Sequence, residues 1–150
     1  METRLKIKGH LNLRVVRADG TIEEFDFKNL VVTYGLNLMA KYLSGGTVST
    51  PVNHIAVGTG TTPPSSTNTA LGVEVSRKQA SVAQGVGADA HKVTFQATWA
   101  AGQLNNSFTE AGLFDAATAG NMFSRVTFAA VPVSSADTLI ATWVISFTGV

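Results

Sequence analysis

Residues 29–43, NLVVTYGLNLMAKYL, form the one segment of any length whose pattern predicts an α-helix. Its apolar residues recur with the spacing of a single helical stripe: Leu36, Met39, Ala40 and Leu43. A helix of about three turns is not stable alone in water, so this stripe must be covered. We therefore expect one short helix that lies against a sheet or closes one end of it.

The residues on either side mark the ends of this helix. Thr33 can serve as the N-cap, because its hydroxyl can accept a hydrogen bond from a free N–H of the first turn. Residues 44–46, Ser-Gly-Gly, tolerate the left-handed turn with which many helices end. The helix is predicted over about residues 33–44.

The composition indicates a chain with ample core and little surface charge. Hydrophobic residues make up 45% of its 150 residues and charged residues only 14%. In a typical soluble domain about a quarter of the residues are charged. Two interpretations stay open: part of the surface is hidden in an assembly, or a sheet rich in serine and threonine is exposed. We expect one domain over residues 1–150.

Charge and cysteine content narrow the possible partners and sites. The net charge is +1 without a long run of either sign, so nucleic acid and anionic membranes are not expected partners. The absence of cysteine excludes disulfides, thiolate metal sites and cysteine nucleophiles. The N-terminus has no run of signal-peptide type and no later run approaches a membrane span, so we expect a soluble protein made in a cytoplasm.

Most of the chain has the alternating pattern of short strands. Residues 11–17 and 22–27 flank Asp19-Gly20, a pair that favours a type I′ hairpin turn. In that hairpin Leu11, Leu13 and Val15 share one face, with Phe25 and Phe27 opposite them.

Further strands are predicted at 54–57, 70–78, 93–99, 108–114, 122–128 and 138–147. Residues 80–90 are expected to form an exposed loop and residues 131–137 a turn. Seven or eight short strands at near-regular spacing predict a mostly β fold, an antiparallel β-sandwich of jelly-roll type with one short helix.

The motifs of common enzymes are missing. Residues 58–64, GTGTTPP, begin like a phosphate-binding loop, but two prolines follow where such a loop would open a helix, and a tight turn is the better interpretation. The histidines His10, His54 and His91 stand apart from other metal ligands. No Gly-x-Ser-x-Gly elbow and no acid–base pair of carboxylates is present. We predict no enzyme, no cofactor, no metal and no small-molecule substrate.

Four charged residues lie in or beside predicted strands: Glu74, Arg77, Glu110 and Arg125. A charge in an apolar strand is costly unless it is paired. One hypothesis is a buried or interfacial ion pair between a carboxylate from Glu74 or Glu110 and a guanidinium from Arg77 or Arg125. The alternative is that these side chains alternate outward into solvent.

The order of the segments carries a resemblance. After the Asp-Gly hairpin the chain continues with KNLVVTYGLNLMA (28–40), HIAVGTGTT (54–62), TALGVEVSR (69–77), FTEAGLFD (108–115) and LIATWVI (139–145). In this order the chain resembles small β-rich virion structural proteins of tailed bacteriophages and prophages. Such proteins include capsid decoration (cement) proteins and tail-fibre or baseplate subunits.

The resemblance implies a non-enzymatic particle component. We expect a capsid decoration protein on the capsid surface that binds the major capsid protein and forms a homo-oligomer, a dimer or a trimer. A tail-fibre or baseplate subunit is the alternative, and a carbohydrate-binding β-sandwich module is a more remote one. Candidate contact residues, chosen for expected exposure in the segments 1–8, 59–68 and 80–90, are Thr3, Arg4, Lys6, Thr61, Thr62, Pro63, Pro64 and Val86.

Overall fold

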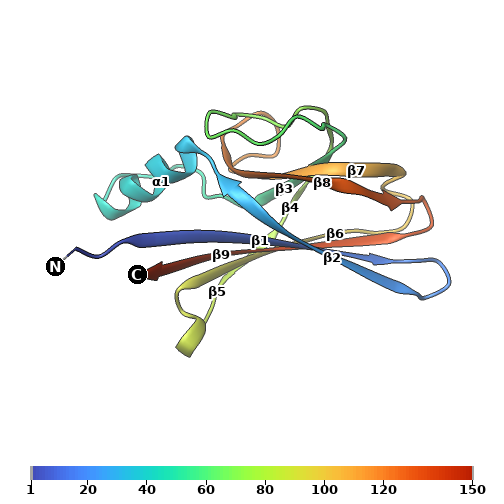
Figure 1. Ribbon diagram of the computed structural model, residues 1–150, viewed down its shortest axis with the longest axis horizontal. Coiled ribbons are helices and arrows are strands. Elements are labelled where there is room, and N and C mark those ends of the chain that lie inside the picture. Colours follow the sequence, from blue (N-terminus) through green and yellow to red (C-terminus); the bar gives the residue numbers. More distant parts are fainter. Residues whose placement is uncertain (1, 150) are drawn as a thin grey trace.

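The computed structural model describes residues 2–149, which form nine strands and one α-helix (Figure 1). The strands are β1 (Leu5–Val16), β2 (Ile22–Val31), β3 (His54–Gly58), β4 (Glu74–Gln79), β5 (Ser81–Gln84), β6 (Lys92–Trp99), β7 (Asn106–Phe114), β8 (Met122–Val133) and β9 (Thr138–Gly149). They belong to one sheet of order β4-β3-β7-β8-β2-β1-β9-β6-β5, and all neighbours are antiparallel.

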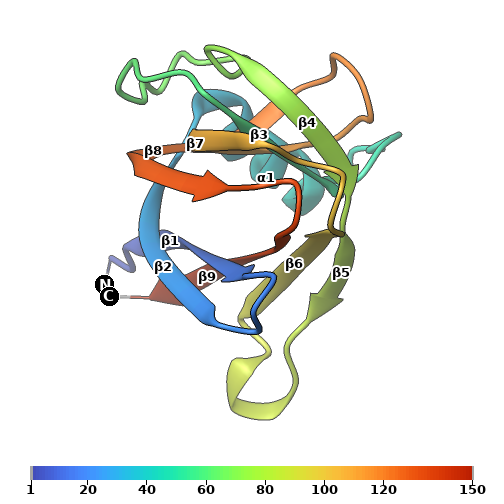
Figure 2. The same cartoon turned by 90° about the vertical axis from the view of Figure 1, so that its right-hand side faces the viewer.

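This sheet curls until it nearly closes into a barrel, so the predicted two-sheet sandwich is wrong (Figure 2). On one side β2 pairs with β1 along its length and with β8 at Leu30 and Val31. On the other side β4 and β5 follow each other across Ala80, and they pair with β3 and β6, at opposite ends of the strand order. Strand number and turn spacing cannot separate the two architectures, because both need one buried face on every strand.

The interior of the barrel follows the predicted alternation. Leu11 and Leu13 are fully buried, and the register places them opposite Phe27 and Phe25, as predicted for the first hairpin. Alternate residues of β6 and β9 complete the wall with Trp99 and Trp143, both buried. The alternation of apolar and polar residues with a period of two therefore correctly predicts which side chains of these strands face the core.

The turn of the first hairpin differs from the predicted type. Only Gly20 takes a positive φ, +86°, among residues 17–21, whereas a type I′ turn needs two such residues. Arg17 N–H donates to Thr21 O, and the Asp19 side chain accepts from Thr21 N–H. The side-chain hydrogen bond of Asp19 stabilises this longer turn without a second strained residue.

Several strands are longer than expected. β1 begins at Leu5, so residues 5–8 of the predicted N-terminal contact segment 1–8 are paired with β9. The expected loop 80–90 contains β5 and a 3₁₀ turn at Gly87–Asp89, and β8 continues through residues 131–133. In each case pairing with a neighbouring strand overrode a weak local signal.

Helix α1 (Thr33–Leu43) has nearly the predicted bounds but a different buried face. Gly35 and Leu38 are buried, whereas Leu36 is exposed and Leu43 is 90% exposed. Val32, not Thr33, is the N-cap, and the Thr33 hydroxyl donates instead to Ser66 O. The predicted end is confirmed, because Ser44 is the C-cap and Gly45 has a φ of +73°. Within residues 2–149, α1 and every other helical segment falls short of the length and apolarity that a membrane span needs.

Candidate functional site

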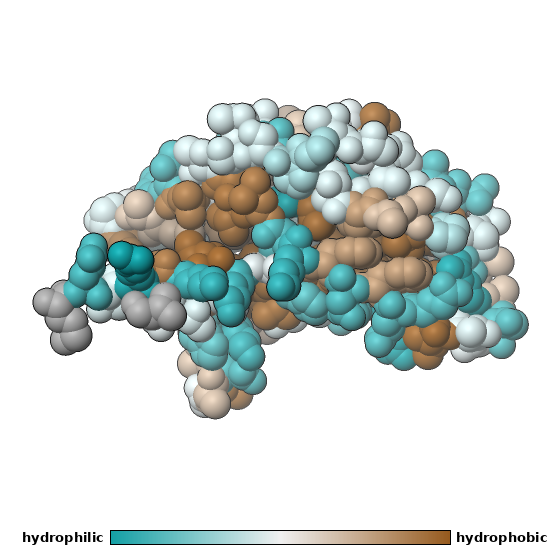
Figure 3. Space-filling view, viewed as in Figure 1, coloured by the Kyte–Doolittle hydropathy of each residue, from teal (hydrophilic) through white to brown (hydrophobic). Residues whose placement is uncertain are grey.

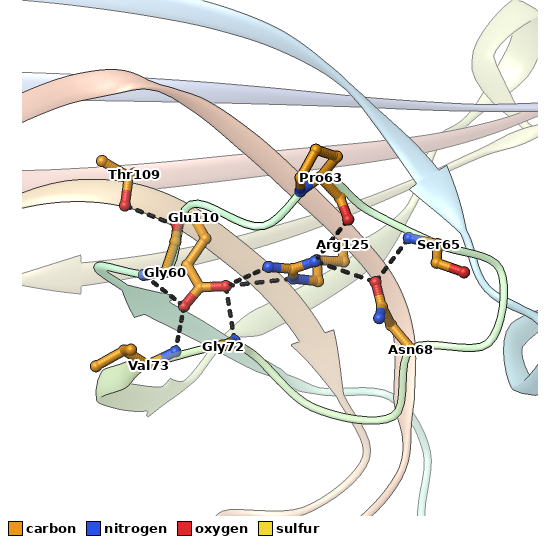
Figure 4. Close-up of polar contacts among 9 residues, drawn as sticks. All are labelled: Gly60, Pro63, Ser65, Asn68, Gly72, Val73, Thr109, Glu110 and Arg125. Atoms are coloured by element: carbon orange, nitrogen blue, oxygen red, sulfur yellow. Dashed lines mark hydrogen bonds and ion pairs between the residues drawn. The ribbon is translucent and has the colours of Figure 1, made fainter.

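The long loop 59–73 lies over the outer face of β7 and β8 and is fixed there by one carboxylate (Figure 4). Glu110 Oε1 accepts hydrogen bonds from Gly60 N at 2.9 Å and from Val73 N at 2.7 Å. Its Oε2 accepts one from Gly72 N at 2.9 Å. Both ends of the loop are thus bound to the same side chain of β7.

Arg125 of β8 completes this network. Its Nη2 and Nε lie 2.8 and 3.2 Å from Oε2 of Glu110, and its Nη1 donates to Asn68 Oδ1 at 3.1 Å. The exposed fractions are 0% for Glu110 and 2% for Arg125. The guanidinium thereby joins the carboxylate to the middle of the loop, and Asn68 in turn accepts from Ser65 N.

The network explains the glycines that resemble a phosphate-binding motif. A Cβ atom on Gly60 would overlap Oε1 of Glu110, and one on Gly58 would overlap Val73 O. The loop needs glycine here so that its backbone can approach a carboxylate of the same chain. The backbone N–H groups that a phosphate-binding loop would offer to a ligand are donated here to the carboxylate of Glu110.

Hydrogen bonding and burial act in opposite directions on the acidity of Glu110. Burial alone would raise its pKa, because it disfavours the charged form. The hydrogen bonds from Val73, Arg125, Gly72 and Gly60 outweigh burial, so the pKa of Glu110 lies below its ordinary value. The carboxylate is therefore charged in the folded protein at neutral pH.

The other two predicted residues form a second pair. Arg77 Nη2 lies 2.6 Å from Glu74 Oε1, three residues away on β4. Arg77 also donates to the carbonyls of Ala116 and Ala119, and its guanidinium carbon is 3.7 Å from the centre of the Phe114 ring. This pair fastens the 115–121 turn to β4, and Glu74 is more open to solvent than Arg77.

Two further carboxylates, Asp115 and Asp137, are buried, and the sequence pattern did not predict their pairing. Asp115 accepts hydrogen bonds from Tyr34 Oη at 2.9 Å and from Asn121, which links α1 to the β7–β8 turn. Asp137 lies 2.8 Å from Arg17 Nη1 and joins the β8–β9 turn to the first hairpin. Asp137 is the last residue of the predicted turn 131–137, and Asp115 directly follows the predicted strand 108–114. An acidic residue at the end of a strand or in a turn is a weak local signal, and it does not identify the distant partner.

An apolar groove of about 290 Å³ opens beside α1 at one end of the barrel. Its lining is formed by apolar side chains of α1, β5, β6 and β9 with their neighbours, among them Leu38, Met39, Tyr42, Val82, Phe95 and Phe147. Tyr42 and Val82 are about half exposed at its rim. Figure 3 shows hydrophobic side chains gathered beside α1, while hydrophilic ones follow β1.

The predicted contact residues fall in three separate places. Thr3 and Arg4 precede β1, and Lys6 lies on β1 and is exposed. Thr61, Thr62 and Pro63 are exposed on the loop 59–73, and Pro64 is half-buried. Val86 is 85% exposed at the tip that follows β5. The structure does not bring the three groups into one surface.

The described residues 2–149 contain no group of three or more His, Cys, Asp or Glu side chains arranged to hold a metal ion. Comparison of the chain with protein-family models, with curated proteins and with solved structures found no match. The resemblance given above therefore depends only on the segments quoted for it.

Proposed function

We propose that this protein is a non-enzymatic structural component of a tailed-bacteriophage virion, a capsid decoration protein that binds the major capsid protein and stabilises the head. The proposal combines the order of sequence segments with one structural observation. That observation is the loop 59–73, which is long, uncharged and yet held in one conformation by the buried Glu110–Arg125 pair.

A fixed loop suits a protein that works through contact area. A mobile loop of this length would lose conformational freedom on binding, and that loss would weaken the complex. Here hydrogen bonds already fix the backbone at Gly60 and Gly72 and the side chain of Asn68, while Thr61 and Thr62 remain exposed to meet a partner. The buried pair thus prepares a neutral surface for docking.

The proposed self-association, as a dimer or a trimer, draws support from the apolar end of the barrel. Tyr42 and Val82 are about half exposed at the rim of the groove beside α1, and Leu43, which follows Tyr42 at the end of α1, is also exposed. Exposed apolar side chains that lie together are typical of contact surfaces. Sedimentation of the purified protein over a range of concentrations measures its mass, and a monomer throughout would contradict this part of the proposal.

The first test of the function is the copy number in purified virions. Quantitative mass spectrometry should find this chain in a fixed ratio to the major capsid protein. A small number of copies per particle would place it in the tail and favour the fibre or baseplate alternative. The carbohydrate-binding alternative needs a platform of exposed aromatic rings. Both tryptophans, Trp99 and Trp143, are buried, whereas Tyr42 is about half exposed.

A binding experiment tests the loop itself. Heads that lack this chain should bind the purified protein, and Thr62→Arg should weaken that binding by placing a charge on the neutral surface. Ala101→Arg is the matched control, because it adds the same charge at an exposed turn outside the loop and outside the predicted contact segments. Equal loss in both variants would show that added charge, and not the loop, is responsible.

A further inference from the structure

The outer face of the sheet carries a cationic groove close to the chain termini. This groove has a volume of about 710 Å³, and its walls come from β1, β2, β6 and β9. Its basic side chains are Lys6, Lys8, His10, Lys28 and Lys92. They converge although the chain as a whole carries a net charge of only +1.

The strand register explains why these residues meet. Lys8 and Lys92 both pair with Ser146 of β9, from opposite sides, so they flank one residue. With neighbouring strands about 4.8 Å apart, their backbones lie about 10 Å from each other. Lys28 of β2 stands opposite His10. The sequence hides this cluster because residues 8, 28 and 92 are far apart in the chain.

Part of this positive charge has no counter-charge in the described structure. His10 lies 3.1 Å from Asp26, and Lys92 lies 2.7 Å from Asp89. Among residues 2–149, no carboxylate lies within 4.0 Å of Lys8 or Lys28. Both lysines are exposed on the groove. Like charges that are held together on a rigid sheet favour an anionic partner.

We propose that this groove binds a short acidic segment of a partner polypeptide in an extended conformation. Lys6 and Lys8 alternate along β1 and lie about 7 Å apart. Carboxylates at alternate positions of an extended segment have the same spacing, so each can meet one lysine. The hydroxyl of Ser146 lies between Lys8 and Lys92 and can donate a further hydrogen bond.

A polypeptide fits the groove better than a nucleic acid does. Asp26 and Asp89 border the cluster and would repel a phosphate backbone that continued past it. The lining contains no arginine and no Phe, Tyr or Trp ring on which a base could stack. A short carboxylate segment ends before it reaches these acidic borders. The proposal concerns the purified chain and does not rest on its location in a virion.

The test is a titration of the isotope-labelled protein with a short oligoglutamate peptide, followed by NMR at low salt. Amide signals of residues 6–10, 28, 92 and 146 should shift, and the shifts should shrink as salt screens the charges. Lys8→Gln and Lys28→Gln should each weaken binding about two- to fivefold. Lys41→Gln is the control, because it removes an exposed lysine of α1 outside the groove and should leave affinity unchanged.

Three results would overturn the proposal. The first is the absence of shifts at low salt, and the second is an equal loss of affinity in the Lys41→Gln control. The third is tighter binding of duplex DNA, or of phosphatidylserine vesicles, to the same residues, which would assign the groove to that other class of partner.

Discussion

Nη2 of Arg125 lies 2.8 Å from Oε2 of Glu110, and both side chains are buried although they project from the outer face of the barrel. The loop 59–73 buries them, because its backbone N–H groups satisfy the carboxylate and its Asn68 satisfies the guanidinium. Moving two charges out of water is costly even when they are paired. We infer that the pair is kept because it specifies one conformation of the loop.

Glu110→Ala should lower the free energy of unfolding by about 3–5 kcal/mol, because it leaves the guanidinium of Arg125 buried without its counter-charge. The control is Glu74→Ala, which breaks the more exposed pair with Arg77 and should cost about 1 kcal/mol or less. Chemical denaturation of both variants measures the difference. Equal losses would mean that the Glu110–Arg125 pair is not shielded from solvent.

The stability of the protein should fall in acid partly because of Glu110. Its pKa is lower in the folded protein than in the unfolded chain, so the unfolded state binds the proton first as pH falls. The stabilisation is present above the ordinary pKa of glutamate and is lost as pH falls through the lower, folded value. Other carboxylates with lowered pKa, such as Asp115, contribute in the same direction.

A comparison with Glu110→Gln isolates this contribution. From about pH 6 to about pH 3, the wild type should lose more unfolding free energy than the variant does. Urea denaturation at several pH values gives both curves. Parallel curves would show that Glu110 titrates in the folded protein as it does in the unfolded chain.

Gly60→Ala and Gly72→Ala should differ sharply, although both residues donate a backbone hydrogen bond to Glu110. A Cβ on Gly60 would overlap the carboxylate of Glu110, so the loop must move away from its anchor. A Cβ on Gly72 meets its nearest atom, Cα of Gly60, at 3.4 Å, which is an ordinary contact. We expect limited proteolysis within 59–73 to accelerate for Gly60→Ala only. Equal rates would contradict the close approach at Gly60.

How far the sequence predicts this structure depends on the range of the interactions. Period-two alternation placed Leu11 opposite Phe27 correctly, because both the pattern and the pairing are local to one hairpin. The pattern does not predict that the sheet curls into a barrel. That curvature depends on the consecutive strands β4 and β5, which pair with β3 and β6 at opposite ends of the strand order. For the candidate site, the apolar neighbours of Glu110 and Arg125 indicate that these charges need a partner. The pattern assigns residues 70–73 to a strand at 70–78, whereas β4 begins at Glu74, so it does not predict that these residues end the loop that covers the pair.

Helix α1 shows a second limit of pattern reading. Its buried face is built on Gly35 and Leu38, and glycine adds nothing to a hydrophobic stripe. A Cβ on Gly35 would lie 2.5 Å from Phe123 O, so the helix rests on β8 through this bare backbone. The apolar stripe instead predicts that Leu36 and Leu43 are buried, whereas both side chains are exposed to solvent.

Leucine truncations in α1 test this corrected face. Leu38→Ala should cost about 2–5 kcal/mol, because it removes a buried side chain from the lining of the apolar groove. Leu43→Ala should change the unfolding free energy by less than about 0.5 kcal/mol, since that side chain is exposed. Thermal and urea unfolding of the two variants suffice. A larger loss for Leu43 would restore the face predicted from the sequence.

Trp143→Ala should cost about 3–5 kcal/mol, because the ring is fully buried in the barrel. Trp143→Phe is the informative partner, since Nε1 of Trp143 has no hydrogen-bond partner within the described chain. Replacing the indole with a phenyl ring therefore reduces the buried volume but breaks no hydrogen bond. It also removes the buried, unpaired N–H group of the indole, which is unfavourable in the folded protein. We expect Trp143→Phe to retain most of the stability that Trp143→Ala loses, as measured by urea unfolding. A loss below about 1 kcal/mol for Trp143→Ala would mean that the ring does not fill the core.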